Sequence, residues 1–253
     1  MKRRLGCRPD EIDRRDFPFR MTARIAAKLP GKFSLRDRWA FGIRDQGPLG
    51  SCVGEGAVEA YAWADFVQTG QARAWHSALM AYYVGRLDQG TVEYDSGLSI
   101  RGEIKSLRKH GVCEESSWPY QVERFRERPP GACWEEAERN QLLIGRRVQE
   151  NFDALCAAVF ADGYGRAVMF GHAVHEGFMD TAASGVVAMP TGQESVLGGH
   201  CQVLIGFERR KERFVGVNSW GEGWADEGFC LFTWQYLRRY ARDFWAVDKV
   251  EEG

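Results

Sequence analysis

The sequence predicts an α+β fold in two lobes, with a helical lobe that precedes a β-rich lobe. Apolar residues recur at helical spacing between residues 52 and 109. Short β-rich runs punctuated by glycine follow residue 167. Between these parts, residues 119–138 are charged and proline-rich, which is typical of a crossover between lobes.

The elements are expected in the following order along the chain. Residues 1–31 are rich in Arg, Asp and Pro without a sustained period, which predicts an arm laid over a folded body. The strongest helix prediction is 52–68, which Gly70 ends, and further helices are expected at 77–87, 100–109 and 154–161. Strands are expected at 167–170, 186–189, 202–207, 213–217 and 229–233. The single domain 1–253 thus divides into the arm, a helical lobe at 32–125 and a β-rich lobe at 126–253.

Composition and charge limit the classes of function. The chain has 253 residues, 44% of them hydrophobic, enough for the core of one two-lobed domain. With 34 Lys and Arg residues against 35 Asp and Glu, the net charge of −1 gives no reason to expect nucleic acid or an anionic membrane as a partner. The sequence has no run of about 18 apolar residues, so we predict no membrane-spanning helix.

The seven cysteines predict a reducing location. Their number is odd and their spacing irregular, unlike a secreted scaffold held by disulfides. The first residues carry charge followed by more charge, where a secretory signal has an apolar run. The sequence therefore predicts a cytoplasmic protein.

The densest chemical signal is the segment Gln46-Gly-Pro-Leu-Gly-Ser-Cys52, which ends where the strongest helix prediction begins. A cysteine there lies at the positive end of the helix dipole, beside N–H groups without helical partners, and both favour the nucleophilic thiolate. Gly47 and Gly50 allow a substrate backbone to approach the sulfur closely. A buried, unreactive cysteine in a Gly-rich turn is the alternative interpretation.

A base for this cysteine is predicted at His200. Gly198-Gly199 precedes it and an apolar strand follows, which places the imidazole at the mouth of a sheet. A polar turn at 207–213 should return the chain antiparallel to this strand and bring Asn218 near the ring. The Asn218 amide would then hold the imidazole in the tautomer that faces the thiolate. A lone histidine at the start of a strand is otherwise more often structural.

Together these residues resemble the papain-like cysteine peptidases over most of the chain. The Gln46–Cys52 segment matches the family signature at all but one specified position, and Gly199-His200 matches its histidine motif. Asn218-Ser-Trp-Gly-Glu-Gly-Trp224 matches the asparagine motif, and Asp95-Ser-Gly97 is similar to the family's glycine wall. The start of the chain, Gly6-Cys-Arg-Pro-Asp10, further resembles the intracellular bacterial and archaeal branch.

The resemblance implies a papain-like fold, with the active site between a helical and a β-barrel-like lobe, and peptide-bond hydrolysis through an acyl-enzyme on Cys52. His200 would form a resting ion pair with Cys52 and protonate the leaving amine, and Asn218 would orient the imidazole. Gln46 would donate to the oxyanion together with the backbone N–H of Cys52. Trp220 would shield the contact between His200 and Asn218 from water. No cofactor and no metal are expected.

The implied partner is a peptide or protein substrate in an extended conformation, held in part as an added strand. The residues implied to line its site are Gly50, Ser51, Ser96, Gly97, Leu98 and Cys201. Because the arm at 1–31 is aperiodic and broken by proline, we add the hypothesis that it partly covers this site.

Departures from the family pattern leave other functions open. Val53 and Gly54-Glu55 replace the usual Trp, Ala and Phe after the nucleophile, so a peptide-binding protein with weak or no catalysis is one alternative. An enzyme that passes the acyl group to an amine instead of water is another. Leu49 stands where secreted members hold a half-cystine, in agreement with a reducing location.

Two weaker motifs point to different chemistry. Gly50-Ser-Cys-Val-Gly54 also fits the nucleophile elbow of an α/β hydrolase, but residues 42–46 are too polar for the buried parallel strand that the elbow requires. His172 and His175 suggest a pair of metal ligands, yet on a strand they would point to opposite faces, and no third ligand is evident. We therefore expect neither an elbow nor a metal site.

Overall fold

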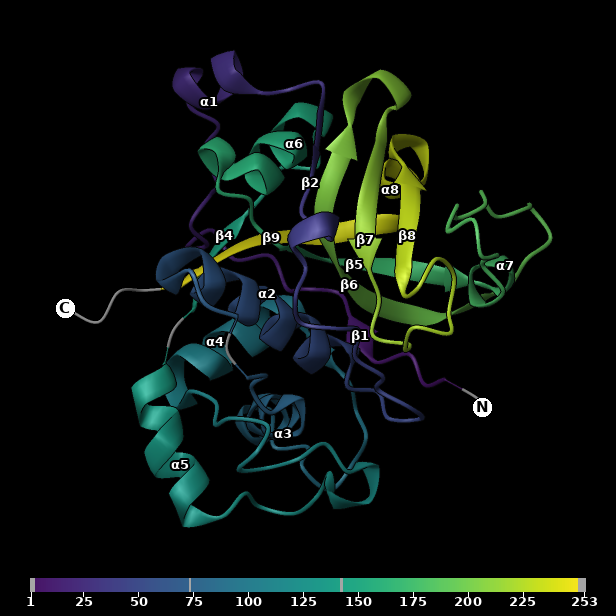
Figure 1. Cartoon of the computed structure of the whole chain (residues 1–253). Helices are drawn as coiled ribbons and strands as arrows, with labels where there is room; N and C mark the ends of the chain where they lie inside the picture. Colours follow the sequence, from purple (N-terminus) through teal and green to yellow (C-terminus); the bar gives the residue numbers. More distant parts are fainter. Residues whose placement is uncertain (1–2, 73, 142, 250–253) are drawn as a thin grey trace.

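A computed structural model describes residues 3–72, 74–141 and 143–249. Helices α2, α3, α4 and α5 gather on one side of the molecule, and an antiparallel sheet lies on the other (Figure 1). The predicted α+β fold is therefore confirmed. None of the described helices combines the length and the apolar character needed to cross a membrane.

The sheet has seven strands, in the order β4-β9-β5-β6-β7-β8, with β2 paired to β6. Its strands are β2 (Lys32–Ser34), β4 (Leu143–Arg147), β5 (Val168–His175), β6 (Val196–Glu208), β7 (Arg213–Val217), β8 (Phe229–Thr233) and β9 (Ala241–Lys249). A separate parallel pair joins β1 (Cys7–Arg8) to β3 (Leu98–Ser99). This second pair ties the N-terminal arm to the helical side of the molecule.

The helices follow from local sequence. They are α1 (Ala23–Lys28), α2 (Cys52–Thr69), α3 (Ala78–Asp88), α4 (Ile100–His110), α5 (Gly131–Ala137), α6 (Phe152–Phe160), α7 (Glu176–Met179) and α8 (Trp234–Tyr240). Ser77 and Ser99 cap α3 and α4 by accepting backbone N–H groups of the first turn. Gly70 ends α2 in a left-handed conformation with φ of 69°. The helices predicted at 52–68, 77–87, 100–109 and 154–161 are thus confirmed, with ends shifted by one or two residues.

The sheet separates two hydrophobic clusters. Along β6, Val203 and Ile205 belong to the cluster shared with α2, α3 and α4, whereas Leu204 belongs to the cluster shared with α6 and α8. This alternation follows the two-residue period of a strand. Because α2 packs directly on β6, the N-terminus of the helix and the His200 strand are brought to the same place.

Several sequence predictions are corrected by the structure. Residues 186–189 form no strand, since Val186 makes only an isolated bridge to Leu231. The charged stretch 119–138, expected to be a crossover, contains helix α5, which begins directly after Pro130 because the N-terminal end of a helix needs no N–H from proline. β5 and β6 are longer than predicted, and β1, β2, β4, β9, α1 and α8 had no prediction.

Candidate active site

Cys52 is the first residue of α2 and is fully buried. The backbone N–H groups of Cys201, Gly6 and Val53 interact with its sulfur. Cys201 belongs to β6 and Gly6 to the N-terminal arm, so the sulfur lies where the helical side, the sheet and the arm meet. No strand precedes it among the described residues 35–51, which excludes the α/β-hydrolase elbow.

His200 and Asn218 are joined as the strand pairing predicted. β6 and β7 are antiparallel, with Val203 opposite Val217, and Asn218 follows at the end of β7. Nε2 of His200 lies 2.7 Å from Oδ1 of Asn218. The ring of Trp220 lies 4.8 Å from the imidazole, centroid to centroid, and is itself buried. Nδ1 of His200 is buried and makes no hydrogen bond, so it is the ring nitrogen left for chemistry.

Gln46 has its side chain fixed at both ends. Its Oε1 accepts from Ser219 Oγ at 3.0 Å and from Trp220 Nε1 at 3.2 Å. Its Nε2 donates to the carbonyl oxygen of Leu49 at 2.8 Å and to that of Arg4 at 3.1 Å. Sequence analysis did not single out Ser219, which holds the amide in this orientation.

The N-terminal arm passes between the helical side and the sheet (Figure 1), where the Gly6 N–H interacts with the Cys52 sulfur. The Gly6 carbonyl accepts from the Leu98 N–H at 2.8 Å. A methyl group at Gly6 would overlap the Gly50 carbonyl, and one at Gly97, which has φ of 69°, would overlap the Gly6 carbonyl. The backbone of Gly6 in the arm thus packs against both Gly50 and Gly97.

Two arginines tie the start of this segment to the body. Arg3 forms an ion pair with Asp45 and donates to the Trp220 carbonyl at 2.6 Å. Arg4 Nε lies 3.0 Å from Asp95 Oδ2, and Asp95 also accepts from the Gly50 N–H at 3.1 Å. Asp45 and Asp95 were not predicted as site residues, because their role depends on an arm whose path no local pattern reveals.

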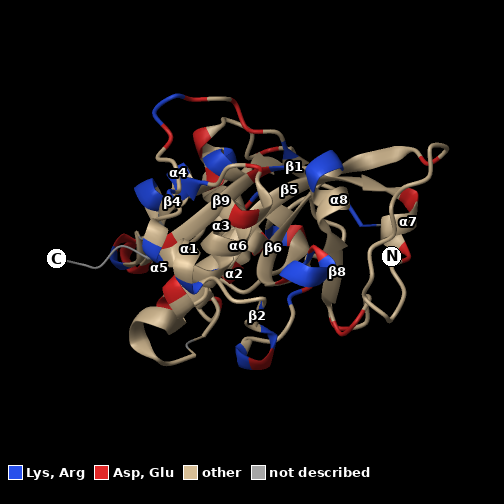
Figure 2. Cartoon of the chain, turned by 90° about the horizontal axis from the view of Figure 1, so that it is seen from above, with Lys and Arg blue, Asp and Glu red and all other residues tan. Residues whose placement is uncertain are grey.

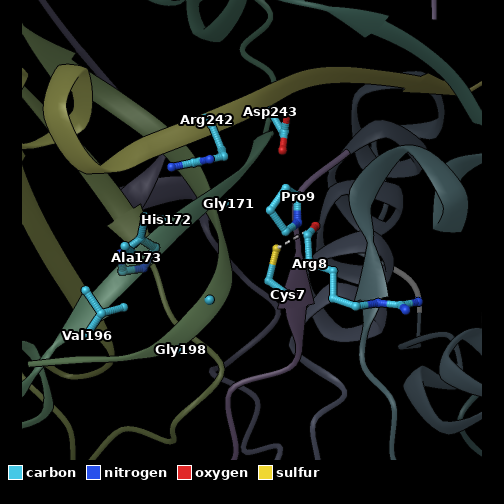
Figure 3. Close-up of a pocket in the computed structure, with 11 residues that line it drawn as sticks. Cys7, Arg8, Pro9, Gly171, His172, Ala173, Val196, Gly198, Arg242 and Asp243 are labelled. Atoms are coloured by element: carbon cyan, nitrogen blue, oxygen red, sulfur yellow. Dashed lines mark hydrogen bonds between the residues drawn. The ribbon is translucent and has the colours of Figure 1, made fainter. Parts of the chain in front are cut away.

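Cys7 projects into a cavity of about 200 Å³ beside the arm (Figure 3). Its walls come from the arm, from β5 and β6 and from the start of β9, and include Gly171, Val196, Gly199 and Arg242. Cys7 thus places a side chain of the arm in a cavity between the arm and the sheet.

The pKa values of Cys52 and His200 in this covered site are shifted in the directions opposite to those that the predicted ion pair requires. Burial raises the pKa of the Cys52 thiol to about 11. Burial also lowers the pKa of His200 to about 4, against the Asn218 hydrogen bond that raises it. Both shifts favour the neutral thiol and the neutral imidazole over the expected resting ion pair. Helix-dipole stabilisation is about 0.3–1 kcal/mol, which does not offset complete desolvation of a thiolate.

The other predicted substrate residues are only partly brought together. Gly50 and Gly97 contact the arm directly. The Ser51 hydroxyl instead bonds the Tyr120 hydroxyl at 2.5 Å, and that of Ser96 bonds Thr91 at 2.8 Å. The Cys201 side chain is buried toward α2, and Leu98 is buried in the helical core. The hydroxyl groups of Ser51 and Ser96 therefore bond within the helical side of the molecule, and the Cys201 thiol packs against α2.

The histidines considered as metal ligands are structural. His172 Nδ1 lies 3.2 Å from the Tyr236 hydroxyl, and the His175 ring packs 4.7 Å from that of Tyr240. Among the described residues, no group of three His, Cys, Asp or Glu side chains has the arrangement needed to hold a metal ion.

The residues that depart from the family pattern behind Cys52 form a compact support. Gly54 lets α2 approach α3, because a methyl group there would lie 3.1 Å from the Tyr82 nitrogen. Glu55 is buried and forms an ion pair with Arg44, which also lies 3.2 Å from Glu115. The Arg44 carbonyl in turn accepts from the Gly221 N–H at 2.8 Å. This network anchors the loop that carries Gln46.

Glu55→Gln is expected to lower the free energy of unfolding by about 1–3 kcal/mol, because the buried Arg44 guanidinium loses a charged partner. Urea unfolding measures the change. The exposed Glu135→Gln is the matched control and should stay within about 0.5 kcal/mol of the wild type. Equal unfolding midpoints for the two variants would contradict this role of Glu55.

A buried helix-terminal cysteine, a histidine held by an asparagine and an amide donor aimed at a carbonyl are the groups that thiol-dependent acyl transfer uses, here in an α+β fold. The chain belongs to the papain family of cysteine proteases, whose sequence profile matches residues 29–237. It is 32% identical over 251 residues to a peptidase C1-like protein of Acanthamoeba polyphaga mimivirus, an alignment that covers 92% of this chain and 80% of the viral protein.

Solved structures agree with this membership. Xylellain, a cysteine protease from Xylella fastidiosa, superposes with a TM-score of 0.89 at 29% identity, over 99% of each chain. Procathepsin B S9 of Trypanosoma congolense superposes with a TM-score of 0.74 at 12% identity, over 98% of this chain and 87% of its own, which shows the shared fold. The chain is therefore a papain-like cysteine peptidase that acts on peptide substrates.

Proposed function

We propose that Cys52, His200, Asn218 and Gln46 are the catalytic set of this cysteine peptidase, and that residues 3–8 are its intramolecular inhibitor. The observation that carries the proposal is the Gln46 amide, which donates to the Arg4 carbonyl beside the buried sulfur. A substrate carbonyl that replaces the Arg4 carbonyl meets the same donor.

The reaction begins when the arm leaves and water reaches the site. The desolvation that raises the pKa of Cys52 and lowers that of His200 is then relieved, and the proton moves from sulfur to Nδ1 of His200. The thiolate attacks the scissile carbonyl carbon, and the oxyanion is held by the Gln46 amide and the backbone N–H of Cys52. Collapse expels the amine, which takes the proton from His200. Water, deprotonated by His200, then hydrolyses the thioester.

The arm runs through the site in the direction opposite to a substrate. Arg3 packs by Trp220, on the His200 side where the leaving amine departs. Cys7-Arg8 lies on the other side and pairs in parallel with β3. The acyl half of a substrate, which is N-terminal to the scissile bond, would lie along β3 in the antiparallel sense. The arm thus blocks the site without offering a correctly oriented peptide bond.

We further propose that the substrate is an extended peptide gripped by Gly50 and Gly97, and that Trp220 shields the His200–Asn218 contact. Both glycines already contact an extended segment of this chain. We place the enzyme in the reducing cytoplasm, a proposal supported by its seven free thiols. Cell fractionation with an antibody against the chain tests this location, and recovery in an extracellular fraction would contradict it.

An extended peptide with a C-terminal vinyl sulfone, a thiol-selective electrophile, tests the catalytic set. We expect it to modify Cys52 alone among the seven cysteines, as mapped by mass spectrometry, because the peptide carries the electrophile to the sulfur at the start of α2. The small vinyl sulfone without the peptide is the control and should react far more slowly. Modification of another cysteine, or equal rates for both reagents, would contradict the assignment of Cys52 as the nucleophile.

Product analysis separates peptidase activity from the two alternatives. Digestion of a peptide library in water enriched in heavy oxygen should place the isotope in each new carboxyl terminus, because water accepts the acyl group. A peptide-binding protein would give no new termini. An acyltransferase would give products joined to an added amine in preference to water.

A further inference from the structure

Arg101, in the first turn of α4, is paired with the N-terminal arm. Its Nε lies 2.6 Å from Asp16 Oδ1, and its Nη2 forms a second ion pair with Asp13. Both carboxylates belong to the arm, while the guanidinium is largely buried, with 13% of the side chain exposed. Release of the arm therefore leaves this arginine in place without either carboxylate.

Asp10 of the arm lies next to Arg101 in a group of buried donors, which we call the cradle. Its carboxylate is fully buried, and it accepts from the Arg101 backbone N–H at 2.9 Å and from the Trp245 indole N–H at 2.7 Å. Arg147 Nη1 lies 3.5 Å away. The indole is itself 3% exposed, so its donor has no access to bulk water. A helix N-terminus, a buried indole N–H and two arginines together make a carboxylate-binding site.

This cradle lies further along the path that the arm takes from the active site. The arm contacts Leu98 through Gly6 and reaches Arg101 at Asp10, four residues further along an extended path. A peptide that replaces the arm beside Cys52 must run over the same surface on its acyl side, provided it extends far enough. Charged residues of both signs gather where the arm passes α4 and β4 (Figure 2).

Two cavities, of about 440 and 260 Å³, are each lined in part by Arg101 and in part by the arm. Some of the described residues that line these cavities lie outside the arm. Three of them are cationic, namely Arg101, Lys105 and Arg108, and none is a carboxylate. Asp243, a body carboxylate that accepts from the Asp10 N–H, pairs with Arg147 at 2.6 Å. Once the arm leaves, the surface is cationic.

We propose that this surface is a substrate-recognition site that binds acidic residues of the peptide N-terminal to the scissile bond. Arg101 is its principal specificity residue, and Asp10, Asp13 and Asp16 of the arm occupy it in the inhibited state. The acidic position lies about four residues further from the scissile bond than the residue that replaces Gly6. The inference rests on the proposed roles of Cys52 and of the arm.

The test uses the full chain with Asp13→Asn and Asp16→Asn, which frees Arg101 without truncation. A peptide library is digested, and Asp and Glu are compared with Asn and Gln at each position upstream of the cleaved bonds. We expect about a tenfold preference for the acids at the positions over Arg101, because a charged donor is paired with a carboxylate there. Adding Arg101→Gln should reduce this preference below about twofold. Adding the exposed Arg139→Gln instead is the control and should leave it unchanged.

No acidic preference upstream, or a preference that survives Arg101→Gln, would overturn the inference. If no variant cleaves any peptide, the proposed catalytic set fails, and binding decides the recognition site separately. A fluorescein-labelled peptide with the sequence of residues 8–17 should then bind the double variant tightly. The same peptide with Asn in place of each Asp and Gln in place of Glu should bind about tenfold more weakly. Arg101→Gln should remove that difference, and equal binding of the two peptides would overturn the inference.

Discussion

Gln46→Glu is expected to lower kcat by about 10²- to 10³-fold, the range found when one oxyanion donor is removed. The substitution keeps an oxygen for Ser219 and Trp220 but replaces the donating amide by a second oxygen. That oxygen faces the place now taken by the Arg4 carbonyl, so a developing oxyanion meets an acceptor instead of a donor. The comparison is made at saturating peptide, where competition from the arm no longer affects the rate.

Two readouts separate this role from a structural one. Thermal unfolding of Gln46→Glu should remain close to the wild type if the contacts to Ser219 and Trp220 persist. Its kcat should recover in part as the pH falls, because a protonated carboxyl group regains an O–H donor. A kcat within about threefold of the wild type, with the fold intact, would show that Gln46 is not an oxyanion donor.

The local parts of the fold were accessible from sequence. Helix α2 has apolar spacing and a left-handed glycine stop, so its ends follow from the residues themselves. β9 is different, because it begins directly after α8 and pairs with both β4 and β5. Its existence depends on partners that lie about 70–100 residues away in sequence, and no local period specifies that pairing.

The candidate site also has features that local sequence predicts and features that it does not. Cys52, His200 and Asn218 lie in motifs whose order and spacing carry their chemistry, and β6 and β7 place the last two together as expected. The rise in the pKa of Cys52 was not predicted, because it comes from burial to which a distant segment contributes, and local sequence does not report that burial. The contacts of Arg3 and Gly6 were not predicted for the same reason, since each is made with a residue more than 40 positions away.

Gly6→Ala is expected to activate the enzyme. The added methyl group overlaps the Gly50 carbonyl, so the arm must shift out of its seat beside Cys52. Overpacking of this kind costs about 1–3 kcal/mol, which corresponds to a roughly 5- to 150-fold shift toward the open state. Because arm and peptide exclude each other, KM should fall by up to that factor while kcat stays unchanged. Peptide cleavage over a range of substrate concentrations measures both constants.

Gly31→Ala is the matched control, because a methyl group there has no atom within 4 Å to meet. It changes the same residue type in the same arm, and should leave KM at the wild-type value. Alkylation of Cys52 by iodoacetamide gives an independent measure of the open fraction. Its rate should rise with Gly6→Ala by the factor by which KM falls, since both report exposure of one sulfur. If KM falls while alkylation stays slow, Gly6 acts on peptide binding alone, and the arm is not what keeps Cys52 buried and neutral.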